Sequence, residues 1–194
     1  MRAFLLFILL AGPTWAQGRE PATVVQADLD RDGKREAYRI RDGREGMVDL
    51  VVAKGGRERV APGVAWTGGM AGQQPELSVS PAGSVVLTSK NEGIGRDRWR
   101  LALTIAHRDG ELRVAGITYD WTDTLDVQAG WGRCDLNLLS GRGEVETVAG
   151  RREVEVPFAA PLLWDWRDEA PPPWPEVCLE PGRAPGADQS GDSR

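Results

Sequence analysis

The chain has 194 residues, a formal net charge of -5 at pH 7 and a single histidine. Its arginines and lysines are interleaved with aspartates and glutamates, which argues against nucleic acid or an anionic membrane surface as a partner. The length suits one well-buried domain and is short for two, and the sequence leaves the oligomeric state open.

The first sixteen residues have the organisation of a secretory signal peptide. Arg2 makes the start positive, residues 3–11 form an apolar run, and Thr14 and Ala16 place small residues before a cut at Gln17. The run is about half as long as the ~20 residues that a membrane-spanning helix needs, so we expect cleavage and no membrane insertion afterwards. This predicts a periplasmic or secreted protein.

The two cysteines, Cys134 and Cys178, are expected to form one disulfide, because exported proteins fold in an oxidising compartment. Closing a loop of about 45 residues would stabilise the fold by roughly 4 kcal/mol in the chain-entropy description. A reactive thiol or a metal ligand is the alternative, but no further cysteine or histidine lies near either residue in sequence.

Short alternating runs, separated by many of the 24 glycines and 13 prolines, predict an all-β chain. The predicted strands lie near 23–26, 36–41, 47–53, 58–61, 76–80, 84–89, 98–107, 111–120, 134–139, 143–148 and 152–157. Most links between them are two to five residues long, which predicts an antiparallel meander. About ten such strands must form a sandwich, a bent sheet or a partly open barrel to bury one face.

One long hairpin is predicted around a two-residue turn at Asp109-Gly110. Counting outward from this turn, the predicted pairs on one largely apolar face are Leu101 with Thr118, Leu103 with Gly116, Ile105 with Val114 and His107 with Leu112. On the other face Arg108 meets Glu111, so opposite charges flank the turn.

The domain is expected to extend over residues 17–180. Residues 162–180 contain too many prolines for a central strand, so we expect this segment to lie across the domain and to be held by Cys178. Residues 181–194 have the composition of a disordered tail.

The sequence "DLDRDGKRE", residues 28–36, has the spacing of a calcium-binding loop. Its carboxylates stand at the first, third, fifth and ninth positions, and Gly33 at the sixth allows a sharp turn. An EF-hand would have its glutamate at the twelfth position, which is Arg39, and would have helices on both sides. The alternative is a plain charged turn, as we expect for the other "RDG" sequences at 41–43 and 108–110.

With its acid at the ninth position and a strand following, this loop resembles the calcium loop of FG-GAP and VCBS repeats, which occur in integrin-like β-propellers and in many secreted bacterial proteins. The resemblance covers this loop alone, and the chain has no repeat at a fixed period. It implies a calcium cofactor with four side-chain ligands and one backbone carbonyl ligand: Asp28, Asp30, Asp32 and Glu36, with the carbonyl of Lys34.

A second stretch, residues 119–135, combines aromatic and acidic side chains after the long hairpin. Aromatic faces beside carboxylates suit sugar recognition, which makes this loop a candidate ligand site. The candidate residues are Tyr119, Asp120, Trp121, Asp123, Asp126 and Trp131. The alternative is structural, with the aromatic rings in the core and the aspartates in turns.

No stretch of the sequence specifies a reaction. His107 is the only histidine and flanks a hairpin turn, and no nucleophile-elbow pattern is present, so the sequence argues against nucleophilic catalysis.

Two classes of function remain. The favoured one is an exported, non-catalytic, calcium-stabilised β-domain that binds a glycan or a protein partner or serves the cell envelope. The alternative is a carboxylate-dependent glycoside hydrolase that uses the loop at 120–126.

Overall fold

A computed structural model describes residues 22–179. The signal peptide predicted at 1–16 and the tail predicted at 181–194 lie outside the described residues. Within residues 22–179 the chain forms eleven strands and one short helix, so the prediction of an all-β domain is confirmed. None of the described helical structure is long and apolar enough to span a membrane.

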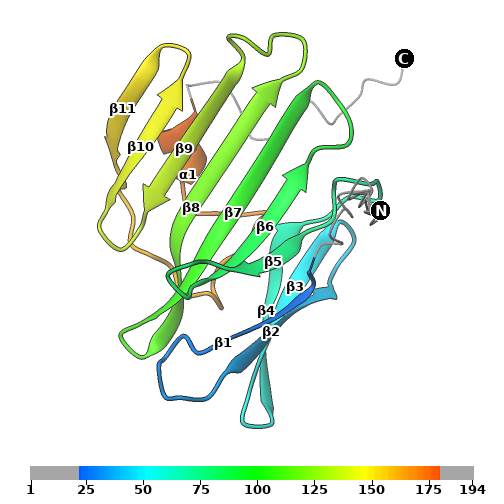
Figure 1. The fold of residues 1–194 in the computed structure, drawn as a ribbon, viewed down its shortest axis with the longest axis vertical. Helices are drawn as coiled ribbons and strands as arrows, with labels where there is room; N and C mark the ends of the chain where they lie inside the picture. Colours follow the sequence, from blue (N-terminus) through cyan, green and yellow to red (C-terminus); the bar gives the residue numbers. More distant parts are fainter. Residues whose placement is uncertain (1–21, 180–194) are drawn as a thin grey trace, which may run out of the picture.

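The strands form two antiparallel sheets (Figure 1). The four-stranded sheet has the order β1 (Val24–Ala27), β2 (Glu36–Asp42), β3 (Met47–Lys54) and β4 (Arg57–Trp66). The seven-stranded sheet contains β5 (Glu76–Val79), β6 (Val85–Asn91), β7 (Asp97–Arg108), β8 (Glu111–Asp123), β9 (Trp131–Asn137), β10 (Arg142–Thr147) and β11 (Gly150–Glu155) in chain order. Neighbours in each sheet are consecutive in the chain, which confirms the predicted meander.

The two sheets approach each other at β1 and β5. The amide of Leu77 on β5 donates to the carbonyl oxygen of Ala22, just before β1, at 2.7 Å. At the other ends of the sheets, β4 and β11 do not pair with one another in the described structure, so the sheets do not close into a barrel. Of the three architectures that the sequence allows, a sandwich or bent sheet agrees with this arrangement.

The C-terminal segment, residues 157–179, crosses between the sheets. Near its start the Leu163 amide donates to Leu112 on β8 at 2.9 Å, and further along the Asp168 amide donates to Gly63 on β4 at 3.0 Å. The segment ends in the short helix α1 (Trp174–Cys178) beside the seven-stranded sheet (Figure 1). This confirms the prediction that the segment lies across the domain.

A disulfide joins Cys178 in α1 to Cys134 on β9, with the two Cα atoms 5.5 Å apart. Both cysteines are buried. The predicted pairing is therefore confirmed, and the bond holds the end of the C-terminal segment against the seven-stranded sheet.

The β7–β8 hairpin follows the prediction close to its turn and departs from it further away. Asp109 and Gly110 both have positive φ, as a two-residue turn of this kind requires, and Ile105 faces Val114 as predicted. Beyond Ile105 the predicted register was wrong, because Leu103 faces Ile117 and Leu101 faces Tyr119.

A β-bulge at Ala115 causes this shift of register. Val114 and Ile117 are three residues apart, so strict alternation would turn one of them away from the core. The extra residue allows Val114, Ile117 and Tyr119 all to be buried.

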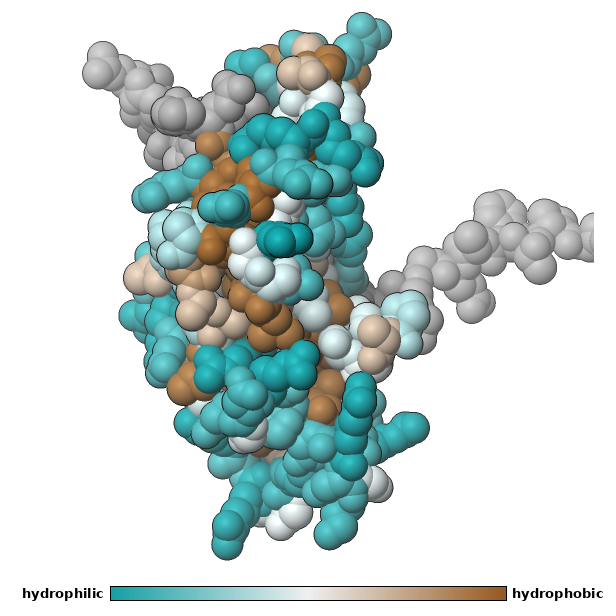
Figure 2. All heavy atoms as spheres, turned by 90° about the vertical axis from the view of Figure 1, so that its left-hand side faces the viewer, coloured by the Kyte–Doolittle hydropathy of each residue, from teal (hydrophilic) through white to brown (hydrophobic). Residues whose placement is uncertain are grey.

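The core lies between the inner faces of the sheets and the C-terminal segment. Its fully buried side chains come from all three parts, for example Leu50 on β3, Leu103 on β7 and Trp166 in the C-terminal segment. Viewed from the side of β11, apolar residues run down the middle of the molecule between hydrophilic margins (Figure 2). Apolar residues are thus visible at the surface on this side, with hydrophilic residues between them (Figure 2).

Candidate metal centre

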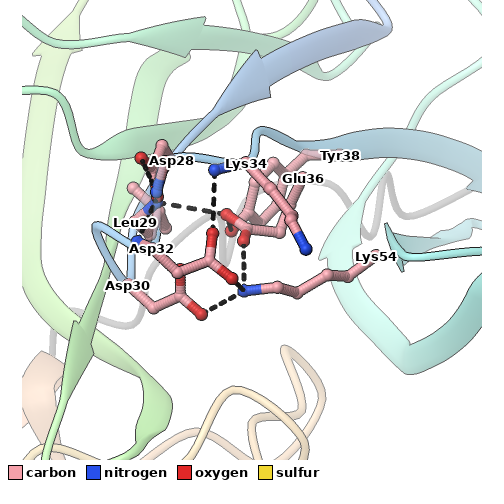
Figure 3. Close-up of polar contacts among 9 residues, drawn as sticks. Asp28, Leu29, Asp30, Asp32, Lys34, Glu36, Tyr38 and Lys54 are labelled. Atoms are coloured by element: carbon pink, nitrogen blue, oxygen red, sulfur yellow. Dashed lines mark hydrogen bonds and ion pairs between the residues drawn. The ribbon is translucent and has the colours of Figure 1, made fainter.

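Four carboxylates gather in the loop that connects β1 to β2 (Figure 3). Each contributes an oxygen to a group whose members all lie within 4.8 Å of one another. The cluster consists of Asp28, Asp30, Asp32 and Glu36. These are the four side chains that the sequence predicts as metal ligands, and the structure brings all of them together.

The backbone of the loop folds around the aspartates. The two carboxylate oxygens of Asp28 accept the amides of Asp32 at 3.1 Å and Gly33 at 3.0 Å, and Asp32 accepts the amide of Lys34 at 2.8 Å. Arg31 and Gly33 have φ of 59° and 86°, so the chain turns sharply at both residues. The turn expected at Gly33 is present, and Lys34, whose carbonyl is the predicted fifth ligand, lies in the same loop.

Glu36 is the buried member of the cluster, with an exposed fraction of 4%. Its Oε2 accepts the amide of Leu29 at 3.1 Å and the hydroxyl of Tyr38 at 3.4 Å. Its Oε1 receives no hydrogen bond within the described residues, and the ammonium of Lys54 lies 3.0 Å from it. Burial, and then the charge of Glu36, raises the pKa of Tyr38.

Lys54, at the end of β3, is a member of this site that the motif alone does not predict. Its Nζ forms ion pairs with Asp30, with Asp32 at 2.9 Å and with Glu36 at 3.0 Å (Figure 3). The signal for it lies in strand pairing, because Ala37 pairs with Ala53 and this register brings the preceding Glu36 toward the following Lys54. Without that register, the sequence does not predict Lys54 as a member of the site.

The contacts of Lys54 set the ionisation of the cluster. Hydrogen bonds from Lys54 lower the pKa of both Asp30 and Asp32, and the Lys34 amide lowers that of Asp32 further. The same carboxylates raise the pKa of Lys54. At neutral pH the two aspartates are therefore anionic, as ligands for a hard cation must be.

Two surface grooves flank the acidic loop. The first, of about 740 Å³, lies between Asp28 and the outer residues of β7 to β9, and the second, of about 620 Å³, contains Glu36 and Lys54. Asp30 and His107 line both grooves. A ligand in either groove would therefore lie next to the carboxylate cluster.

The second candidate site places two of its three aromatic rings in the interior. Tyr119 is 4% exposed and Trp121 is 7% exposed, and their ring centroids are 5.6 Å apart. Tyr119 also packs on Trp174 of α1 at 5.0 Å. Trp131 is half-buried at the start of β9. The geometry favours the structural account of Tyr119 and Trp121.

The three aspartates of this stretch each have protein partners. Asp120 pairs with Arg133 at 2.9 Å, and the Asp126 carboxylate accepts the Ala129 amide at 3.1 Å. Asp123 is buried and accepts two hydrogen bonds from Arg96, at 2.8 and 2.6 Å.

The Arg96 side chain holds the pKa of Asp123 down at about 2. A glycosidase needs a general acid whose pKa is raised. The pKa of Asp123 is lowered instead, so Asp123 does not suit that role.

No protein-family model matches the chain, and no curated protein or solved structure matches it. The interpretation of the acidic loop therefore depends on its own geometry. The four carboxylates could hold a metal ion, and the side chain of Lys54 reaches into the same group and pairs with Asp30.

Proposed function

We propose that this chain is an exported, non-catalytic β-domain that is stabilised by calcium bound in the loop between β1 and β2. The observation that carries the proposal is the convergence of four carboxylates within 4.8 Å in a single short loop. The proposed ligands are the side chains of Asp28, Asp30, Asp32 and Glu36, with the backbone carbonyl of Lys34.

The ligand chemistry supports calcium over the other common metal ions. All proposed donors are oxygens, whereas zinc sites in proteins usually include histidine or cysteine. Calcium accepts six to eight oxygens in flexible geometry, while magnesium requires a near-ideal octahedron and keeps several of its waters. The resemblance to FG-GAP and VCBS loops supports the same choice.

Electrostatics also supports a divalent ion. Within the cluster itself, four carboxylates and the ammonium of Lys54 carry a formal charge of three negatives, because the exposed side chains of Arg31, Lys34 and Arg35 form no ion pair with it in the described structure. Such crowding of like charges destabilises a loop unless a cation offsets it. A calcium ion would remove much of this repulsion.

Export is supported by two independent features. The disulfide between Cys134 and Cys178 is typical of proteins that fold in an oxidising compartment, and the first sixteen residues have the pattern of a signal peptide. We propose a periplasmic or secreted location on this basis.

The proposed role is binding, of a glycan or a protein partner, or service in the cell envelope. The two grooves beside the acidic loop support it, because a ligand there would lie next to the bound ion. A glycan array followed by a hydrolysis assay on any hits tests the role. Retention without turnover supports a binding domain, whereas turnover that is lost in Asp123→Ala would support the glycoside hydrolase.

Thermal unfolding with and without calcium tests the metal site. Extracellular calcium modules bind with Kd of about 10⁻⁴ to 10⁻³ M, and calcium at about ten times Kd adds ~1.4 kcal/mol by mass action. For a domain of this size the Tm should rise by about 3 to 6 °C. Magnesium should raise it less.

Matched variants connect this effect to the loop. The double variant Asp30→Ala with Asp32→Ala should lose the response to calcium, whereas Asp42→Ala, in the similar "RDG" sequence at 41–43, should keep it. The proposal fails if the melting curve is the same in chelator and in several millimolar calcium and calorimetry detects no binding.

A further inference from the structure

The ammonium of Lys54 occupies the position in the carboxylate cluster where a metal ion would be expected. It reaches the cluster from β3 and contacts Asp30, Asp32 and Glu36 (Figure 3). The distances from Nζ to the oxygens of Asp32 and Glu36 are 2.9 and 3.0 Å. A single cationic group thus bridges three of the four acids.

A metal ion and this ammonium cannot share the same oxygens. Calcium binds its ligands at about 2.3 to 2.6 Å, so an ion coordinated by Asp30, Asp32 and Glu36 would lie almost where Nζ lies. Two positive charges at such a separation repel strongly. Calcium binding therefore requires Lys54 to move away.

Glu36 shows why this point of the cluster must hold a cation, either the lysine or a metal ion. It is 4% exposed, and its Oε2 already accepts hydrogen bonds from Leu29 and Tyr38. Its Oε1 is buried and points into the cluster, where its partner is the ammonium of Lys54 at 3.0 Å. If Lys54 left without a replacement cation, this buried carboxylate oxygen would be uncompensated, which is costly.

Lys54 has a route out of the cluster. Its side chain is 38% exposed and lines the second groove together with Glu58 and Glu111. The displaced ammonium would enter this groove beside Glu58 and Glu111, which in this structure pair with Arg39 and Arg59 at the surface. Displacement therefore requires a rotation of the side chain and no movement of β3.

We propose that Lys54 is a built-in counter-ion that competes with calcium for the acidic loop. The proposal rests on the calcium site described above. Without calcium, Lys54 offsets part of the negative charge and keeps the loop folded. When calcium binds, Lys54 is displaced into the groove, so the lysine weakens the apparent affinity and sets the calcium concentration to which the domain responds.

Isothermal titration of calcium into the wild-type chain, Lys54→Met and Arg35→Met tests this competition. Lys54→Met should lower the Kd by about tenfold or more, because it removes a positive charge from the binding position. Arg35→Met removes a positive charge from the same loop, but from an exposed residue that is not a proposed ligand and for which the described structure shows no ion pair, so its Kd should change by less than about threefold.

A second measurement covers the case in which Lys54→Met folds poorly without metal. Its Tm in chelator should be lower than that of the wild type, and calcium should restore it by more than it raises the wild-type Tm. Lys54→Gln, which can still donate a hydrogen bond, should show the same tighter binding. Failure of both Lys54 variants to fold even in calcium would overturn the proposal.

The outcomes separate this inference from the proposed function. Equal Kd values for the wild type and both Lys54 variants would overturn the competition and leave the calcium site standing. The same gain in affinity in Arg35→Met would also overturn it, because the effect would then reflect net charge alone. If no variant binds calcium at several millimolar, the calcium site itself is wrong and the competition fails with it.

Discussion

The indole N–H of Trp166 donates to the carbonyl oxygen of Val64 on β4 at 3.0 Å, and the Trp166 side chain is fully buried. One side chain thus fills core space between the sheets and pairs a backbone carbonyl at the edge of the four-stranded sheet. The C-terminal segment is therefore part of the core and not an appendage.

Trp166→Phe should destabilise the domain by about 1 to 3 kcal/mol, because it leaves the Val64 carbonyl without its donor and creates a small cavity. Urea unfolding monitored by circular dichroism measures the loss. Trp164→Phe is the control, since Trp164 is only partly buried and its N–H donates to Glu111, which is 46% exposed, at 3.3 Å. An equal loss in both variants would contradict a specific role for Trp166.

Removal of the disulfide should loosen one part of the molecule first. Cys178→Ala opens a loop that spans 44 residues in sequence, which should cost about 4 kcal/mol in the chain-entropy description. Hydrogen exchange should rise earliest in residues 160–179, while the β7–β8 hairpin stays protected. Uniform loss of protection over the whole domain would instead place the segment within one cooperative unit.

The strands are predictable from sequence because turn residues mark their ends. Asp109 and Gly110 illustrate this, since both adopt the positive φ that their residue types tolerate. Register is less predictable. The bulge at Ala115 has a signal in the three-residue spacing of Val114 and Ile117, but alternation alone does not show whether a bulge or an exposed apolar residue resolves it.

One part of the candidate metal site is predictable from local sequence, and the other part depends on contacts between residues far apart in the chain. The four acids lie within one loop, so their spacing in sequence is enough to predict that they meet. Lys54 belongs to a different strand, and its position depends on the register of β2 on β3. That register is set by the turn at 43–46, whose geometry the sequence does not specify.

The ion pair between Arg96 and Asp123 should stabilise the domain above pH 4 and not below pH 2. The pKa of Asp123 is about 2 in the folded chain and about 3.9 when unfolded, so the unfolded state binds more protons as the pH falls between these values. Asp123→Asn should therefore be less stable than the wild type at pH 5, and the difference should shrink toward pH 2. Chemical denaturation at both pH values measures it, and a constant difference would contradict the assignment.

Asp168 should lower the stability of the domain as the pH rises, which is the opposite of the effect expected for Asp123. Its Oδ2 accepts the amide of Trp66 at 3.0 Å where the C-terminal segment meets β4. Burial raises the pKa of Asp168 to about 6, and the negative charge of Glu169 adds to the effect. The unfolded chain has a value of about 3.9, so between these limits the folded state binds more protons than the unfolded state. The contribution of Asp168 to stability is therefore present below about pH 4 and is lost as the pH rises through 6.

Asp168→Asn tests this sign directly, because the amide oxygen can still accept the Trp66 N–H and no charge forms. The free energy of unfolding of the variant, relative to the wild type, should increase from pH 4.5 to pH 7. Asp165→Asn is the control, since Asp165 is an exposed carboxylate in the same segment and forms no ion pair within the described residues. If Asp168→Asn has the same pH profile as the wild type, the carboxylate is ionised at no cost and the contact with Trp66 outweighs its burial.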